Sequence, residues 1–405
     1  MDKIEQKILE IIDKNAEKII AFGDDIWHHA ELGYYEFRTS KKFSEQLESL
    51  GLECEKEIAI TGVKSYLKEH KEGDVQIALM GEFDALPFPE YKDANPETGA
   101  AHLCGHNAQI TGVIGAAMAL CDTEVKEALD GNVVFMGVPN EEGSTAVELK
   151  SKLIEEGKVR YIGGKQEFVR LGVMDDIDLT VGHHVLGDPS VDPKSYVAVN
   201  GTSMGHMDKA IHFTGVSQHP AWSFKAVDAL SGARLAMSAI DIQREAINKY
   251  HYWNTNILHG FIRSGGTATN VVSNDVMMDY NLRAKTLNDM LDMSYRVDRA
   301  VKGAAIATGT GVEIKTTPGY LPAQPLDDVS IVSEVFDIID PEKKHNRIVK
   351  PKDDVGTTTD FADLSNLMPV IQFNTNGNVG VCHTLEFAVD DPYEYFVVPA
   401  KCFAL

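Results

Sequence analysis

The stretches VQIALMGEFDALP (residues 75–87) and NVVFMGVPNEEG (132–143) decide the fold of this chain. Each is a short apolar run of strand length that ends directly in acidic residues. Between them, ITGVIGAAMALCD (110–122) has the length of a helix, and IDLTVGHHVL (177–186) follows another helix-like stretch at 150–157. Strand-like runs that alternate with helix-like ones predict a parallel sheet with crossover helices.

Three of the predicted strands end in residues that can carry chemistry, in GEFDALP, VPNEEG and VGHHVL. In open α/β sheets, ligands bind at the carboxyl ends of the strands. We therefore expect these polar ends to converge on one crevice.

The pattern changes in the middle of the chain. Strand-like runs there interleave with two helix-like segments, 226–250 and 288–308, which predicts an inserted α+β domain with an antiparallel sheet. The α/β pattern then resumes. We predict a catalytic domain formed by 1–196 and 316–405, with 197–315 inserted as a separate domain.

Composition limits the classes of function. A chain of 405 residues exceeds the size at which one core stops growing, which agrees with two domains. The formal net charge of -23 opposes binding to nucleic acid. No apolar run approaches the roughly 20 residues of a membrane span, and the five scattered cysteines do not suggest a disulfide framework. We expect a cytoplasmic protein without nucleic-acid or membrane partners.

The motif HLCGHN contains the first candidate metal ligands. Cys104 and His106 flank Gly105, a spacing that lets a thiolate and an imidazole meet one ion where the backbone bends. In isolation, this pattern more often indicates a buried cysteine and a helix-capping histidine. Glu141 and Glu142 offer two carboxylates, of which one can bind metal while the other takes a proton from water.

Histidines follow two further apolar runs. His183 and His184 form an adjacent pair, and His383 lies near the C-terminus. Imidazole is the commonest protein ligand for zinc-like ions, although a single histidine is more often structural. Four separate segments that together offer Cys, His, Glu, His and His favour a metal site.

Taken in order, these motifs give the chain a resemblance to peptidase family M20, the metallopeptidases and amidohydrolases. The resemblance is most specific to subfamily D, with aminobenzoyl-glutamate hydrolase and dipeptidase-like proteins. It covers nearly the whole chain, from AELGYYEFRTS near residue 30 to VVPAK at the end, and is carried by GEFDALP (81–87), CGHN (104–107), PNEEG (139–143), GHHV (182–185), GVSQHPA (215–221), GGTATNVV (265–272), GTTTD (356–360) and CHTLEF (382–387).

The resemblance implies a mostly parallel α/β catalytic domain flanked by helices, with an inserted ferredoxin-like lid or dimerisation domain. It also implies two divalent metal ions, zinc, manganese or cobalt. Cys104 takes the place of an aspartate that bridges the ions elsewhere in the family, and the other ligands would be His106, Glu142, His184 and His383. Glu141 matches the general base. Asp84 would orient a ligand from behind.

The resemblance assigns further roles to the inserted domain. His219 would stabilise the developing oxyanion, often in the active site of the partner protomer, so a homodimer is expected. Asn270 and Arg283 fall where the family holds the substrate's carboxylate, which a guanidinium suits because it presents two parallel donors. A salt bridge on the sheet is the alternative for Arg283. Gly356 would allow close approach of the backbone to the substrate.

The expected reaction is hydrolysis of an amide bond in an N-acyl amino acid, an aminobenzoyl-glutamate-like compound or a dipeptide. Two alternatives stay open: a metal-independent hydrolase with Cys104 as nucleophile and His106 as base, and a non-catalytic homologue that binds an acidic metabolite. The chain departs from the family pattern at Asn140, at Ser273 and in the extension VRYIGGKQEFVR (159–170), close to the expected pocket.

Overall fold

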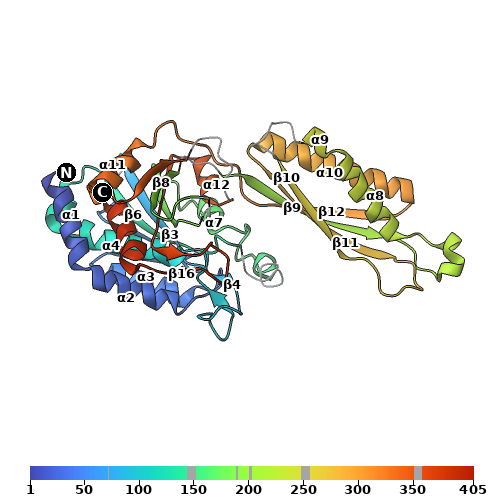
Figure 1. Ribbon diagram of the computed structural model, residues 1–405, viewed down its shortest axis with the longest axis horizontal. Coiled ribbons are helices and arrows are strands. Elements are labelled where there is room, and N and C mark those ends of the chain that lie inside the picture. Colours follow the sequence, from blue (N-terminus) through green and yellow to red (C-terminus); the bar gives the residue numbers. More distant parts are fainter. Residues whose placement is uncertain (72, 144–151, 188–189, 200–202, 248–255, 351–357) are drawn as a thin grey trace. The chain divides into compact units, whose positions relative to one another are not determined.

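The computed structural model describes residues 1–71, 73–143, 152–187, 190–199, 203–247, 256–350 and 358–405. The chain divides into two compact units (Figure 1). Within the described ranges, the first unit comprises Met1–Gly201, Gln324–Lys352 and Asp363–Leu405, and the second comprises Thr202–Ala323 and Asp353–Ala362.

An eight-stranded sheet forms the centre of the first unit. Its strands are β1 (Cys54–Ile58), β2 (Gly62–Tyr66), β3 (Gln76–Glu82), β6 (Asn132–Val138), β7 (Leu179–Val185), β8 (Ser195–Val199), β13 (Asn346–Val349) and β14 (Val370–Thr375). Their order in the sheet is β1-β2-β6-β3-β7-β14-β8-β13, and the four central strands β6, β3, β7 and β14 run parallel. The three strands expected to end at the site are therefore direct neighbours, and the expected α/β class is confirmed.

Helices cover this sheet, and the central one is α4 (His106–Leu120), which packs on β3, β6 and β7. Its residues are small or apolar on every side, as expected for a helix that is buried all round. The remaining helices outside the second unit's sheet domain are α1 (Lys3–Lys14), α2 (Ala16–Trp27), α3 (Phe37–Ser49), α5 (Thr123–Ala128), α7 (Gly164–Arg170), α11 (Ser330–Ile339), α12 (Phe361–Ser365), η2 (Tyr393–Val397) and α13 (Val398–Ala404). Short strand pairs are β4 (Leu86–Pro87) with β5 (Ala100–Ala101), and β15 (Asn378–Val379) with β16 (Ala388–Val389).

The second unit is an antiparallel sheet with two long helices. Its elements are β9 (Gly205–Thr214), η1 (Pro220–Lys225), α8 (Ala229–Ile242), α9 (Arg244–Ile247), β10 (Ile257–Ser264), β11 (Asp275–Ala284), α10 (Leu287–Thr308) and β12 (Gly311–Pro318). The strands are ordered β10-β11-β9-β12, with α8 and α10 packed on the sheet. The chain order β-α-β-β-α-β is that of a ferredoxin-like unit, as expected for the insertion.

The domain limits expected from the sequence fall inside secondary structure, since 196/197 lies within β8 and 315/316 within β12. The catalytic and lid roles of the two parts stay predictions. Within the described ranges, no helix is both long and apolar enough to cross a bilayer.

A left-handed residue begins helix α4. Gly105 has φ of 93°, and a Cβ atom placed there would lie 2.4 Å from Cγ2 of Val185 on β7. Only glycine can therefore stand at this bend. The bend places Cys104 before the helix and His106 in its first turn, both facing the end of β7.

We predict that Gly105→Ala lowers the free energy of unfolding by at least about 2 kcal/mol, because strain and overpacking coincide at this position. Chemical denaturation measures the change. Gly309→Ala is the matched control, since Gly309 also has positive φ but has open space where a Cβ would lie, and should cost only about 1 kcal/mol. Equal losses in the two variants would contradict the proposed steric role of Val185.

Candidate metal centre

The ends of three neighbouring strands meet at one edge of the sheet in the first unit. Asp84 follows β3, Glu141 and Glu142 follow β6, and His184 lies near the end of β7. His383 arrives from the loop after β15, where its backbone N–H donates to the carbonyl oxygen of Leu103 at 2.8 Å. The five residues predicted as ligands are thus brought together: Cys104, His106, Glu142, His184 and His383.

The donor atoms form two groups that share one sulfur atom. Cys104, His106 and His184 make one group, and Cys104, Glu142 and His383 make the other, with the donor atoms of each group within 4.8 Å of one another. The Sγ atom of Cys104 lies 3.2 Å from Nε2 of His184 and 3.2 Å from Nε2 of His383. Oε1 of Glu142 is 3.1 Å from Nε2 of His383. A shared thiolate between two ligand sets has the arrangement that two cations require.

Asp84 orients two of these residues from behind. It faces Nδ1 of His106 with its carbonyl oxygen at 2.9 Å and with Oδ1 at 3.1 Å, and its Oδ2 accepts from the backbone N–H of Glu142 at 2.9 Å. Nδ1 of His184 is likewise 2.8 Å from the carbonyl oxygen of Val185. Both imidazoles therefore turn Nε2 toward the centre, as metal-binding histidines commonly do when their other nitrogen is held.

The donor set fits divalent cations. Nε2 of His106 and Oε1 of Glu142 are buried without a hydrogen-bond partner in the described part of the chain, although each has an ionisable neighbour, Glu82 Oε2 at 3.0 Å and His383 Nε2 at 3.1 Å. Buried polar atoms that lack partners are costly unless something else binds them. Thiolate, imidazole and carboxylate together suit zinc, manganese and cobalt.

The electrostatics of Cys104 bear on its role as a nucleophile. A hydrogen bond with the Cys382 thiol, burial and the nearby carboxylates of Glu142 and Glu141 raise the pKa of Cys104 well above its usual value. Without a cation, the side chain is therefore a thiol and a poor nucleophile. In addition, His106 directs Nδ1 to Asp84. The geometry therefore disfavours the metal-independent alternative.

The predicted base also lies at the centre. Glu141 is 8% exposed, and its Oε2 is 3.9 Å from Nε2 of His106. His183, which the sequence left outside the ligand set, is buried instead against β14, with Nε2 2.8 Å from Oγ1 of Thr375.

The predicted substrate residues of the second unit lie at the two ends of its sheet. The segments around His219 and Asn270 adjoin, because the N–H of Val272 donates to the carbonyl oxygen of Gln218 at 2.9 Å. Both segments continue past the end of the sheet where Asp275 pairs with Thr214.

Arg283 stands at the opposite end of the same strand. It lies in β11, eight residues beyond Asp275, and its Nε donates to Oδ1 of Asn281 at 2.8 Å. At about 3.4 Å per residue, this separates the two ends by about 27 Å. Within one chain, Arg283 and Asn270 are therefore not brought together. Gly356 lies outside the described residues.

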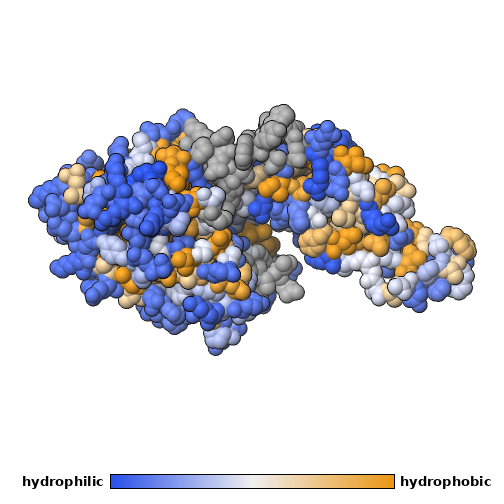
Figure 2. Space-filling view, viewed as in Figure 1, coloured by the Kyte–Doolittle hydropathy of each residue, from blue (hydrophilic) through white to orange (hydrophobic). Residues whose placement is uncertain are grey.

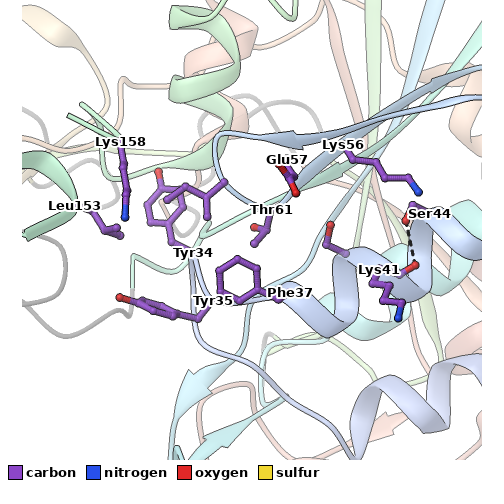
Figure 3. A pocket seen from close by; sticks show the side chains of 12 residues that line it. Tyr34, Tyr35, Phe37, Lys41, Ser44, Lys56, Glu57, Thr61, Leu153 and Lys158 are labelled. Atoms are coloured by element: carbon purple, nitrogen blue, oxygen red, sulfur yellow. Dashed lines mark hydrogen bonds between the residues drawn. The ribbon is translucent and has the colours of Figure 1, made fainter. Parts of the chain in front are cut away.

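A separate pocket of about 770 Å³ opens in the first unit (Figure 3). Aromatic side chains and three lysines line it, among them Tyr34, Tyr35, Phe37, Lys41, Lys56 and Lys158. Each lysine already has an acidic neighbour: Glu45 at 3.8 Å, Glu48 at 2.5 Å and Glu156 at 2.8 Å, respectively. Its lining contains none of the candidate metal ligands.

Sequence reasoning missed three residues beside the centre. Glu82 ends β3, and its carboxylate contacts Lys165 of α7 and Gln109 of α4 as well as His106. The signal for Glu82 was present, because alternate residues of a strand share one face and Glu82 is two positions before Asp84. Lys165 had no such signal, since it lies in the extension 159–170.

The fold and the donors together define an α/β protein with a candidate site for two cations. The model of peptidase family M20/M25/M40 matches residues 78–398 of the chain. The chain is 27% identical to one of the two kinds of chain of the p-aminobenzoyl-glutamate hydrolase of Escherichia coli, over 81% of its own length and 64% of that protein. It is 25% identical to the N-acyl-L-amino acid amidohydrolase of Geobacillus stearothermophilus over 80% of its own length and 82% of that protein.

A solved structure shares the fold. It is a dinuclear metal-binding peptidase of family M20 from Bacillus subtilis, with a TM-score of 0.70 and 21% identity over 97% of both chains. Because the family model matches most of the chain, the chain belongs to peptidase family M20/M25/M40. This confirms the family expected from the motifs and places the chain among hydrolases that act on amide bonds.

We predict that Cys104→Ala removes both cations, because both donor groups contain this sulfur. His184→Ala and His383→Ala should each remove one, since each histidine belongs to a single group. Elemental analysis of purified protein measures the number of cations per chain. Cys121→Ala is the control, as Cys121 is a half-buried thiol at the far end of α4. A Cys104→Ala protein that retains two cations would show that the sulfur is not shared.

Proposed function

We propose that the chain is a binuclear metal-dependent amidohydrolase that cleaves N-acyl amino acids, aminobenzoyl-glutamate-like compounds or dipeptides. The observation that carries the proposal is the pair of donor groups joined at Cys104. Two cations held by the five ligands would polarise the amide carbonyl and acidify a water molecule.

Glu141 is the proposed proton carrier. Its carboxylate lies at the centre, and its neighbour Glu142 occupies the ligand position, so the adjacent pair divides the two tasks. Glu141 takes a proton from the attacking water and returns it to the leaving nitrogen. His219 donates to the oxyanion that develops on the carbonyl.

The substrate class follows from the shared chemistry of the relatives. Their names describe an acyl group on the nitrogen of an amino acid, as in aminobenzoyl-glutamate and N-acyl-L-amino acids. Such substrates leave a free carboxylate next to the cleaved bond. Arg283 is the proposed partner of this carboxylate, and its guanidinium can present two donors to two oxygens.

A homodimer is part of the proposal. His219 and Asn270 lie at one end of the second unit's sheet and Arg283 at the other, so one substrate can meet both ends only if two chains contribute. The second unit also exposes apolar side chains (Figure 2), including Ile242 of α8, Ile306 of α10 and Phe261 of the edge strand β10. An exposed edge strand with apolar residues is a surface that a second chain can cover.

Glu141→Gln tests the assigned base. We expect the variant to keep its cations and to lose turnover by about 10²- to 10⁴-fold, because the amide has no basic oxygen to accept the proton. Activity toward a panel of N-acyl amino acids and elemental analysis are measured together. Glu142→Gln is the comparison, and it should lose a cation. Unchanged turnover in Glu141→Gln would refute the assignment.

Mixing two inactive variants tests the dimer. His219→Ala and Arg283→Ala are refolded or co-expressed together, so that about half of the dimers contain one chain of each kind. If the two residues of one site come from different chains, one of the two sites in each mixed dimer is intact, and about a quarter of wild-type activity returns. No recovery in dimers shown to be mixed would place both residues of a site in one chain.

A further inference from the structure

Glu82 is a buried carboxylate that the five-ligand scheme leaves without a role. It is 2% exposed and ends β3 at the centre of the sheet. Its Oε1 lies 2.5 Å from Nζ of Lys165, and its Oε2 accepts from Nε2 of Gln109 at 2.6 Å. The same Oε2 is 3.0 Å from Nε2 of His106.

The orientation of His106 makes this last contact informative. Its Nδ1 faces the carbonyl oxygen of Asp84, which can only accept, so Nδ1 carries the ring proton. A neutral imidazole then presents a lone pair at Nε2, directed at another acceptor, the Oε2 atom of Glu82. Two buried acceptors at this distance repel each other unless a cation lies beside both.

The distance also suits two ligands of one ion. With metal–nitrogen and metal–oxygen bonds of about 2.0–2.2 Å, ligands at angles of 90–110° lie about 3.0–3.5 Å apart. Glu82, His106 and Glu141 form a further group whose donor atoms all fall within 4.8 Å of one another.

We propose that Glu82 is a sixth ligand of the centre, on the cation held by Cys104, His106 and His184. The proposal rests on the binuclear site proposed above and adds an oxygen donor to one of its two positions. Cys104 and the two imidazoles supply soft and borderline donors, and the carboxylate gives this cation a fourth protein ligand.

Lys165 fixes how Glu82 binds. Its ammonium group is fully buried and holds Oε1, so only Oε2 can reach the cation and the carboxylate binds through one oxygen. The ammonium also offsets one negative charge among the crowded carboxylates. A buried ammonium is costly without an anionic partner, so Lys165 and Glu82 depend on each other.

Cobalt titration tests the proposal. The variant Glu82→Leu/Lys165→Met replaces the whole ion pair by apolar side chains, a change that buried pairs often tolerate without loss of stability. We expect one Co²⁺ to bind at least about 100-fold more weakly than in the wild type, and its d–d absorption to rise at least about twofold because its coordination number falls. Glu82→Gln/Lys165→Met keeps an oxygen donor and should restore much of the wild-type spectrum.

The matched control is Glu167→Gln. Glu167 is a fully buried carboxylate in the same helix α7, where it accepts from the backbone N–H groups of Arg160 and Tyr161 at 2.7 Å. This control should leave the Co²⁺ spectrum unchanged. Circular dichroism verifies that each variant is folded.

The outcomes separate this inference from the proposed function. If the wild type binds no cations, the binuclear site itself fails. If the wild type binds two and the Leu/Met variant binds them with an unchanged spectrum, Glu82 is no ligand, even if affinity falls. A changed spectrum in the Leu/Met variant with recovery in the Gln/Met variant supports direct ligation.

Discussion

The contact of one sulfur atom with two imidazoles is the feature on which the rest of the centre depends. Cys104 Sγ is 3.2 Å from Nε2 of His184 and from Nε2 of His383, residues that are 80 and 279 positions away along the chain. The contact requires β7 to end beside the bend at Gly105. It also requires the His383 loop to dock on Leu103, which it does with His383 at a φ of 66°. Non-glycine residues in this conformation persist only where surrounding contacts hold them, and such positions cluster at functional sites.

The charges around this contact explain why cations matter for the fold as well as for chemistry. Four carboxylates adjoin the sulfur or its histidines, from Glu82, Asp84, Glu141 and Glu142. Their field extends further, since burial and the charge of Asp84 raise the pKa of Glu36 to about 8. Like charges in a buried site repel, and bound cations remove the repulsion, so metal binding should stabilise the folded chain.

The sequence predicts the parts of the structure that depend on local pattern. The apolar runs at 75–83 and 132–139 and the small-residue helix after Gly105 became β3, β6 and α4, and their polar ends meet as expected. The edge strands β1 and β2 and the antiparallel placement of β8 beside β14 were not predicted, because their pairing depends on distant segments. Glu82 escaped notice for a related reason, since its partner Lys165 is 83 positions away.

The departures from the family pattern have a physical explanation in the structure. Asn140, at a φ of 47°, donates from Nδ2 to the carbonyl oxygen of Ile162 at 2.6 Å, and the hydroxyl of Tyr34 donates to the same oxygen at 3.1 Å. Asn140 therefore fastens the extension 159–170 to the loop that carries Glu141 and Glu142. Because the same extension supplies Lys165, the unusual residue before the glutamate pair and the unusual segment after it act as one unit. This unit holds the oxygen donors of the centre in place, so its sequence constrains the metal site as much as the substrate pocket.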